Sequence, residues 1–210
     1  MSEEIIRYEV ATGVATLTLN RPEKRNALNR ELVTALKKAL ARASADTEAR
    51  VVVITGAGKD FCSGADLAEL ERISQMGDEE NLADARSLGA VFVAMRRLPK
   101  PVVAVVRGRA LAGGCGLATA CDLVLAHEGA GFGYPEVQHG FVPAMVMAVL
   151  RRKVTEGRAF ELVVRGHRID AAEARRVGLV NEIFPGASFE DDVDAYLAEL
   201  KAYRAKNPGK

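Results

Sequence analysis

Two glycine-containing segments, residues 58–67 and 108–117, carry the clearest chemical potential in this sequence. Each follows a strand-like apolar run and opens a helix with small residues. Small residues allow a ligand to approach the backbone, and the first N–H groups of a helix have no intrahelical partner. Two such helix starts facing each other could direct two N–H groups at one oxygen, which stabilises a developing oxyanion. Taken alone, either segment could equally use its glycines only for turns and close packing.

Other catalytic patterns do not occur in the sequence. Neither GxxxxGK[ST] nor GxGxxG is present, which disfavours a nucleotide-phosphate loop. Cys62-Ser63-Gly64 does not form the GxSxG of a serine hydrolase. The histidines lack the spacing of metal ligands, so we expect no metal site. These histidines are His127, His139 and His167.

The surrounding pattern predicts an α/β core. Residues 5–10 and 14–19 alternate as in a hairpin, while residues 51–56 and 102–106 are continuous apolar runs typical of buried strands. Strands are also predicted at 122–126 and 179–183, and helices after Asn29, near Ala65 and at 78–98, 113–121, 155–164, 171–177 and 189–205. In the helix at 78–98, an apolar stripe from Leu82 to Leu98 should face the core. This order favours parallel pairing with right-handed crossovers.

Composition bounds the class of protein. The chain has 210 residues, 49% of them hydrophobic, and a net charge of +1. This predicts a globular protein with no general attraction to nucleic acid or an anionic membrane. The acidic N-terminus lacks the features of a signal peptide, and the cysteines lie among small and apolar residues, so we expect a cytoplasmic protein with reduced thiols. The cysteines are Cys62, Cys115 and Cys121.

Five segments together resemble one family. They are residues 21–28, 61–67, 112–122, 132–137 and 178–181. In this order they resemble the crotonase superfamily, the enoyl-CoA hydratase/isomerase family, over nearly the whole chain. The resemblance implies an α/β fold built as a spiral of repeated ββα units. It also implies a core over residues 1–185 for acyl-CoA binding and catalysis, followed by a shortened helical segment at 186–210.

The same resemblance implies the site residues. The backbone N–H groups of Ala65 and Gly113 would form the oxyanion hole, and Glu136 would transfer protons. Coenzyme A would bind along Lys24, Arg25, Ala27, Ala65, Asp66 and Leu67. The substrate would be an acyl-CoA thioester of fatty acid metabolism, and no cofactor beyond its coenzyme A moiety is expected. The family also implies a homotrimer or homohexamer.

One carboxylate of the family's usual acid/base pair is missing. Hydratases with two glutamates carry one at the position that matches Gly116 and the other at the position that matches Glu136. Glu136 lies among aromatic and apolar residues, and an apolar pocket would raise the pKa of its carboxyl. One carboxylate suffices to move a proton between two carbons of an enolised thioester, which slightly favours a double-bond shift over hydration. Hydration stays open, because one residue can act in turn as base and acid.

Three alternatives also stay open. A thioesterase or decarboxylase of the same superfamily would use other acid/base groups, such as Tyr134 or His139. A non-catalytic acyl-CoA-binding protein is suggested by Gly116 and by a sequence that ends earlier than family members usually do. Some relatives bind RNA, but the near-neutral charge gives that alternative no support.

Overall fold

The computed structural model describes residues 4–206, without the side chains of Leu67, Leu70, His139 and residues 204–206. The larger sheet has the strand order β1-β2-β3-β4-β6-β9. Its strands are β1 (Ile6–Ala11), β2 (Val14–Leu19), β3 (Val51–Gly56), β4 (Val102–Val106), β6 (Leu123–His127) and β9 (Glu182–Phe184). The smaller sheet has the order β5-β7-β8. Its strands are β5 (Arg109–Leu111), β7 (Gly131–Gly133) and β8 (Arg168–Asp170).

Helices connect and cover these strands. They are α1 (Arg30–Ala45), α2 (Leu67–Gln75), α3 (Asp78–Arg97), α4 (Gly113–Ala120), α5 (Ala144–Leu150), α6 (Glu156–Arg165), α7 (Ala171–Arg176) and α8 (Phe189–Lys206). Two short 3-10 helices, η1 (Pro22–Lys24) and η2 (Pro135–His139), follow β2 and β7. The start of α1 shows a local cause, because the Asn29 side chain accepts a hydrogen bond from the N–H of Leu32 at 2.8 Å.

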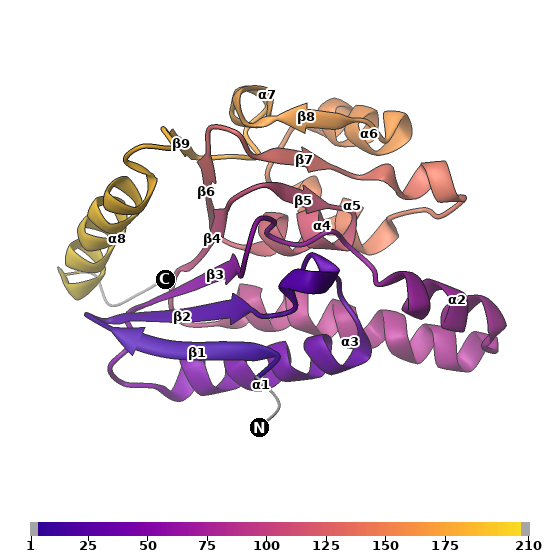
Figure 1. The fold of residues 1–210 in the computed structure, drawn as a ribbon, viewed down its shortest axis with the longest axis horizontal. Helices are drawn as coiled ribbons and strands as arrows, with labels where there is room; N and C mark the ends of the chain where they lie inside the picture. Colours follow the sequence, from indigo (N-terminus) through magenta and orange to yellow (C-terminus); the bar gives the residue numbers. More distant parts are fainter. Residues whose placement is uncertain (1–3, 207–210) are drawn as a thin grey trace.

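The larger sheet is covered on both faces (Figure 1). Strand β3 alternates between two apolar clusters, since Val52 and Ile54 join the core beneath α1 and α3 while Val51 and Val53 face α8. Strands β2, β3, β4, β6 and β9 pair in parallel, and β1 closes one edge as an antiparallel hairpin with β2. The parallel pairing brings the carboxyl ends of β3 and β4 to the same edge of the sheet, where the glycine-containing segments begin.

The predicted elements are largely confirmed, with specific corrections. The stripe prediction was wrong at Leu82, which is 49% exposed, because α3 buries side chains only in its C-terminal half, at Val91, Phe92 and Met95. The last strand begins later than predicted, at Glu182, because residues 177–181 form the turn after α7. Pattern alone did not predict β5, β7, β8 or α5. Helix α8 packs on the sheet through Phe189, Val193 and Leu197, and the division of the chain at residue 185 stays a prediction.

Candidate active site

The two glycine-containing segments, which follow β3 and β4, lie side by side. The N–H of Leu111 donates to the carbonyl of Cys62 at 3.0 Å, so the segments pair like short parallel strands. A Cβ placed on Gly64 would lie 2.7 Å from the Cβ of Ala112, and Gly64 has a φ of +98°. Only glycine at position 64 therefore allows the two segments to touch here. The residues that follow Gly64 and Ala112 are Ala65 and Gly113, the predicted oxyanion-hole residues.

Both predicted donors have free N–H groups. Leu28 pairs with the peptide groups on either side of Ala65, accepting from the N–H of Asp66 at 2.9 Å and donating to the carbonyl of Gly64 at 2.7 Å. In this ladder geometry the N–H of Ala65 itself points away from Leu28. Gly113 is the first residue of α4, so its N–H has no acceptor within the helix. Among the described residues, neither N–H has a hydrogen-bond acceptor.

Backbone strain and close packing hold the start of α4. Ala112 precedes the helix with φ 49° and ψ −129°, a conformation that costs a non-glycine residue about 1–3 kcal/mol. Its N–H donates to the carbonyl of Gly133 at 2.9 Å. A Cβ on Gly114 would lie 2.4 Å from the carbonyl oxygen of Cys62, so the first turn of α4 rests directly on the neighbouring segment. These contacts fix the direction of the Gly113 N–H.

Glu136 lies on η2, which directly follows β7. Strand β7 pairs in parallel with β5, so the residues after these two strands emerge at the same edge. The Oε2 atom of Glu136 is buried and has no hydrogen-bond partner among the described residues. Burial raises the pKa of this carboxyl, as the sequence predicts. The nearby residues Phe132 and Tyr134 are buried, whereas Phe141 is 44% exposed.

A buried polar contact ties η2 to α4. The hydroxyl groups of Tyr134 and Thr119 lie 2.7 Å apart, and Thr119 also donates to the carbonyl of Cys115 at 2.7 Å. Burial, with a smaller contribution from the Glu136 carboxylate, raises the pKa of the Cys115 thiol to about 12. Glu136 thus lies near the first turns of α4, the helix that begins at Gly113. The Tyr134 hydroxyl is buried and already paired, which argues against Tyr134 as an acid/base group.

Position 116 has no room for a side chain. A Cβ on Gly116 would lie 2.7 Å from Cγ2 of Val146 and 3.3 Å from Cζ of Phe92. Val146 comes from α5 and Phe92 from α3, and both are buried. Apolar groups therefore fill the space beside Gly116, and Glu136 is the carboxylate that remains.

The basic residues predicted to bind coenzyme A lie at the edge of this site. Lys24 and Arg25 are exposed at the end of η1, and the carbonyl of Arg25 accepts from the N–H of Ser63 at 3.0 Å. This bond places η1 beside the segment that leads to the free N–H of Ala65. Ala27 is 6% exposed and contributes packing and backbone rather than an accessible side chain.

Asp66 is engaged in the fold through its side chain. Its carboxylate accepts from Arg21 at 2.8 Å and from the N–H of Ala68 at 3.1 Å, which caps α2. Burial opposes ionisation, but the Arg21 guanidinium keeps the pKa of Asp66 below its ordinary value. At Asp66, therefore, only the backbone is available to contact a ligand. The side chain of Leu67 lies outside the described residues.

Buried polar contacts that the sequence did not predict hold the loops of the candidate site in place. The Asn26 side chain accepts from the N–H of Arg21 and donates to the carbonyls of Ala57 and Asp60, all at 2.8–2.9 Å. Asp60 in turn forms a two-pronged ion pair with Arg109, at 2.8 and 2.7 Å. Arg109 keeps the pKa of Asp60 below its ordinary value. Asp60 and Arg109 are 49 positions apart, so no local pattern signals their contact.

The other reactive side chains are not placed for catalysis. The three cysteines are buried and unbridged, and burial raises the pKa of Cys62 to about 12, so it is not a thiolate. The His127 ring packs on Phe189 with centroids 5.3 Å apart. The His139 side chain lies outside the described residues. Within residues 4–206, no three His, Cys, Asp or Glu side chains converge as a metal site.

No helix in the described part of the chain combines the length and the hydropathy needed to cross a bilayer.

Comparisons with known proteins agree with this geometry. The profile of the enoyl-CoA hydratase/isomerase family matches residues 9–206. A Thermus thermophilus protein, provisionally named an enoyl-CoA hydratase, is 46% identical over 89% of this chain and 74% of its own length. The crotonyl-CoA hydratase of Syntrophomonas wolfei is 39% identical over 87% of this chain and 70% of its own. The crystal structure of an enoyl-CoA hydratase from Mycobacterium smegmatis superimposes with a TM-score of 0.90 at 34% identity, covering 95% of this chain and 77% of that one.

Proposed function

This chain belongs to the enoyl-CoA hydratase/isomerase family, and we propose that it hydrates 2-enoyl-CoA thioesters with Glu136 as its single acid/base group. The family, the enzyme class and the crotonase-type α/β fold predicted from the sequence are confirmed. The oxyanion hole, the role of Glu136 and the coenzyme A contacts are our proposals for how this chain acts.

The proposed reaction begins with the thioester carbonyl oxygen accepting from the N–H groups of Ala65 and Gly113. Glu136 removes a proton from water, the water oxygen bonds to C3, and the double-bond electrons move onto the thioester as an enolate. Protonated Glu136 then returns a proton to C2, so one water has been added across the double bond. Removing one donor from such a hole typically costs about 2.7–4 kcal/mol of transition-state stabilisation.

One observation carries this proposal. Two unpaired backbone N–H groups and a half-buried carboxylate, whose buried Oε2 atom has no hydrogen-bond partner among the described residues, gather around the beginning of α4. A buried polar atom without a partner, such as Oε2 of Glu136, is costly unless a ligand completes it. The raised pKa of Glu136 also suits a group that must take up and return a proton in one cycle.

A double-bond shift between 3-enoyl and 2-enoyl thioesters is the second candidate. It is favoured by the packing of Val146 and Phe92 at Gly116, which leaves no space for a second carboxylate. In that reaction Glu136 would take a proton from C2 of the 3-enoyl thioester and return it to C4. The names of the relatives favour hydration, because those from Syntrophomonas wolfei and Escherichia coli are both hydratases.

The named relatives act on different acyl groups. The Escherichia coli relative is named for 2,3-dehydroadipyl-CoA and the Syntrophomonas wolfei relative for crotonyl-CoA. This chain is 40% identical to the first and 39% identical to the second. Identity therefore does not choose between these acyl groups.

We place coenzyme A across the edge formed by η1 and the residue 63–67 segment. Lys24 and Arg25 would contact its phosphates, and the backbone of residues 65–67 would contact its adenine. The link between Arg25 and Ser63 supports this placement, because it joins the basic residues to the oxyanion hole. Assembly as a homotrimer or homohexamer stays a prediction.

The test is an assay of the purified protein with crotonyl-CoA and with a 3-enoyl-CoA, beside Glu136→Gln. We expect the variant to lower kcat by about 10²- to 10⁴-fold while acyl-CoA still binds. Glu9→Gln is the matched control, because Glu9 is an exposed glutamate on β1. The product formed by the wild-type protein identifies the reaction. Acyl-CoA binding without turnover of either thioester would instead indicate a binding protein, and an unchanged rate in Glu136→Gln would remove Glu136 from the mechanism.

A further inference from the structure

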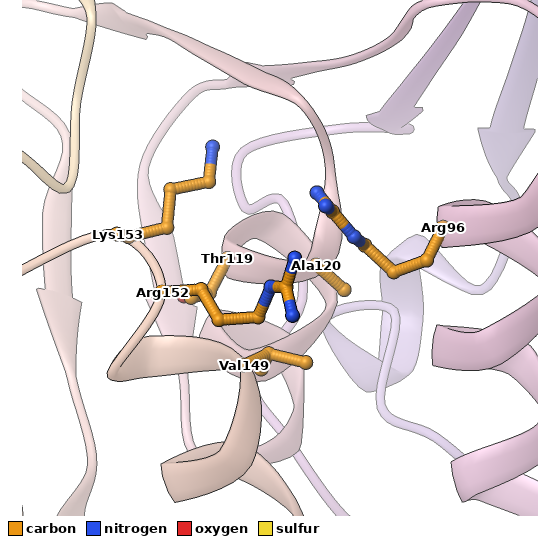
Figure 2. A pocket seen from close by; sticks show the side chains of 6 residues that line it. All are labelled: Arg96, Thr119, Ala120, Val149, Arg152 and Lys153. Atoms are coloured by element: carbon orange, nitrogen blue, oxygen red, sulfur yellow. The ribbon is translucent and has the colours of Figure 1, made fainter.

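A hollow that is separate from the proposed oxyanion hole lies at the opposite end of α4. It has a volume of about 310 Å³ and lies where the end of α3, the end of α4 and the turn after α5 meet (Figure 2). Its lining residues are Arg96, Thr119, Ala120, Val149, Arg152 and Lys153. Three of these side chains are cationic and none is acidic.

The backbone around the hollow holds these cations in place. The N–H groups of Arg152 and Lys153 donate to the carbonyls of Val149 and Leu150 at 3.2 and 2.9 Å, which continues α5 as a tight turn. Arg96 lies in the last turn of α3. Figure 2 shows the side chains of Arg96 and Arg152 entering the hollow from two sides, with both guanidinium groups directed inward.

Asp122, the nearest acid identified beside the hollow, neutralises only part of this charge. Its carboxylate lies 3.5 Å from Arg96, and its carbonyl accepts from the Lys153 ammonium at 2.7 Å. Arg152 has no ion pair or side-chain hydrogen bond with any described residue. Three cations therefore face one carboxylate, which leaves a local surplus of two positive charges.

Stabilisation of the C-terminus of α4 accounts for some of these cations but not for all of them. Cations stabilise the C-terminus of a helix by about 0.3–1 kcal/mol each, and Lys153 with its bond to Asp122 serves this purpose. Arg152 enters the hollow from the same side as Lys153, opposite Arg96 (Figure 2), and its side chain donates to no carbonyl of the described residues. Because both guanidinium groups are directed into the same hollow, an anion bound there could contact both of them.

We propose that this hollow binds a phosphate group. Guanidinium groups form paired, charge-assisted hydrogen bonds with phosphate oxygens, and two of them from separate elements can grip one phosphate. A water molecule occupies about 30 Å³ of liquid, so a hollow of about 310 Å³ accepts more than inorganic phosphate alone. The ligand is therefore inorganic phosphate or the phosphate of a small phosphomonoester. Burial lowers the pKa of Lys153, and a bound dianion offsets this effect by favouring the charged ammonium.

The test is a calorimetric titration of the full chain at low ionic strength with inorganic phosphate and, separately, with glycerol 3-phosphate. We expect saturable binding that weakens as salt rises. Arg152→Gln should weaken it by about tenfold, the typical effect of losing a charge-assisted hydrogen bond. If the ester binds more tightly than inorganic phosphate, the natural ligand is an organic phosphate.

Arg151→Gln is the matched control. Arg151 is the adjacent residue, carries the same charge, and pairs with Glu156 at 2.6 Å outside the hollow. We expect this variant to bind phosphate as the wild-type protein does. Absence of saturable binding, an Arg152→Gln variant that binds as tightly as wild type, or an equal loss in Arg151→Gln would overturn the proposal. Arg152 is exposed, so the substitution should leave folding intact, which circular dichroism verifies.

Discussion

Replacing Gly116 with glutamate tests whether a second carboxylate can be added to this site. The substitution restores the residue type that two-glutamate hydratases carry at this position. In this chain, however, the new Cβ would lie 2.7 Å from Val146 Cγ2 and 3.3 Å from Phe92 Cζ. Real Cβ atoms do not approach other atoms as closely as 2.7 Å, so Val146 or α5 must move.

The structure gives the size of the penalty. Overpacking a core costs about 1–3 kcal/mol, and burying a carboxyl group with incomplete hydrogen bonding costs about 1–3 kcal/mol more. Removing a glycine from the interior of a helix returns about 1 kcal/mol. We therefore expect Gly116→Glu to destabilise the protein by about 3 kcal/mol, or roughly 6–12 °C in Tm for a chain of this size. We also expect no gain in hydratase kcat.

A double-mutant cycle identifies the cause. Val146→Ala alone should cost on the order of 2 kcal/mol, because Val146 is buried. If Val146 is the obstacle, adding Gly116→Glu to Val146→Ala should cost at least about 1 kcal/mol less than adding it to the wild-type protein. Denaturant unfolding measures the four free energies, and crotonyl-CoA hydration measures the activity. A Gly116→Glu variant with unchanged stability, or additive losses in the double variant, would refute the packing argument.

Three further predictions concern the two donors and Glu136. Ala112→Gly should raise the free energy of unfolding by about 1 kcal/mol, since the relief of positive-φ strain exceeds the entropy that glycine adds to the unfolded chain, and thermal unfolding measures this gain. Gly114→Ala should lower kcat by about 100-fold by pushing α4 off Cys62 and misdirecting the Gly113 N–H. The control Gly89→Ala should leave kcat unchanged, because a Cβ at this position of α3 would make only an ordinary contact, 3.5 Å from Sδ of Met145. Glu136 has a raised pKa in the folded protein, so this residue makes stability fall as pH rises from its unfolded pKa through its folded pKa. Glu136→Gln should therefore be more stable than wild type at neutral pH, and denaturant unfolding should show the difference vanishing in acid below the unfolded pKa.

Local sequence signals predicted most elements that build the site. Continuous apolar runs predicted β3 and β4 because strands buried on both faces need apolar residues at every position. The small strands of the second sheet were missed, because each has three residues and β7 contains two glycines. Such short runs show no periodicity and exist only because β5 and β7 pair with each other.

The resemblance supplied the candidate site residues that lie in a motif, whereas contacts that join distant segments could not be predicted. The resemblance identified Ala65, Gly113 and Glu136 before any geometry was known, and the structure leaves all three with unpaired polar groups. It did not indicate that Asp66 would be paired with Arg21. Nor did it indicate what would fill the space beside Gly116. These contacts span tens of residues, and the pattern of one segment contains no information about its partner in another.

In the proposed site, the thioester oxygen is bound by backbone groups and the proton is moved by a side chain, so substitutions should impair the two roles separately. The proposed oxyanion donors are backbone groups, and their positions depend on contacts such as that between Gly64 and Ala112, not on the side chain at position 116 or 136. A carboxylate can therefore be lost while the donors keep their geometry. Loss of Glu136 should remove proton transfer and preserve thioester binding, whereas a shift of α4 should weaken stabilisation of the enolate even with Glu136 intact. On this proposal a site with one carboxylate still supports reactions that pass through a thioester enolate, because the proposed donors do not depend on the missing side chain.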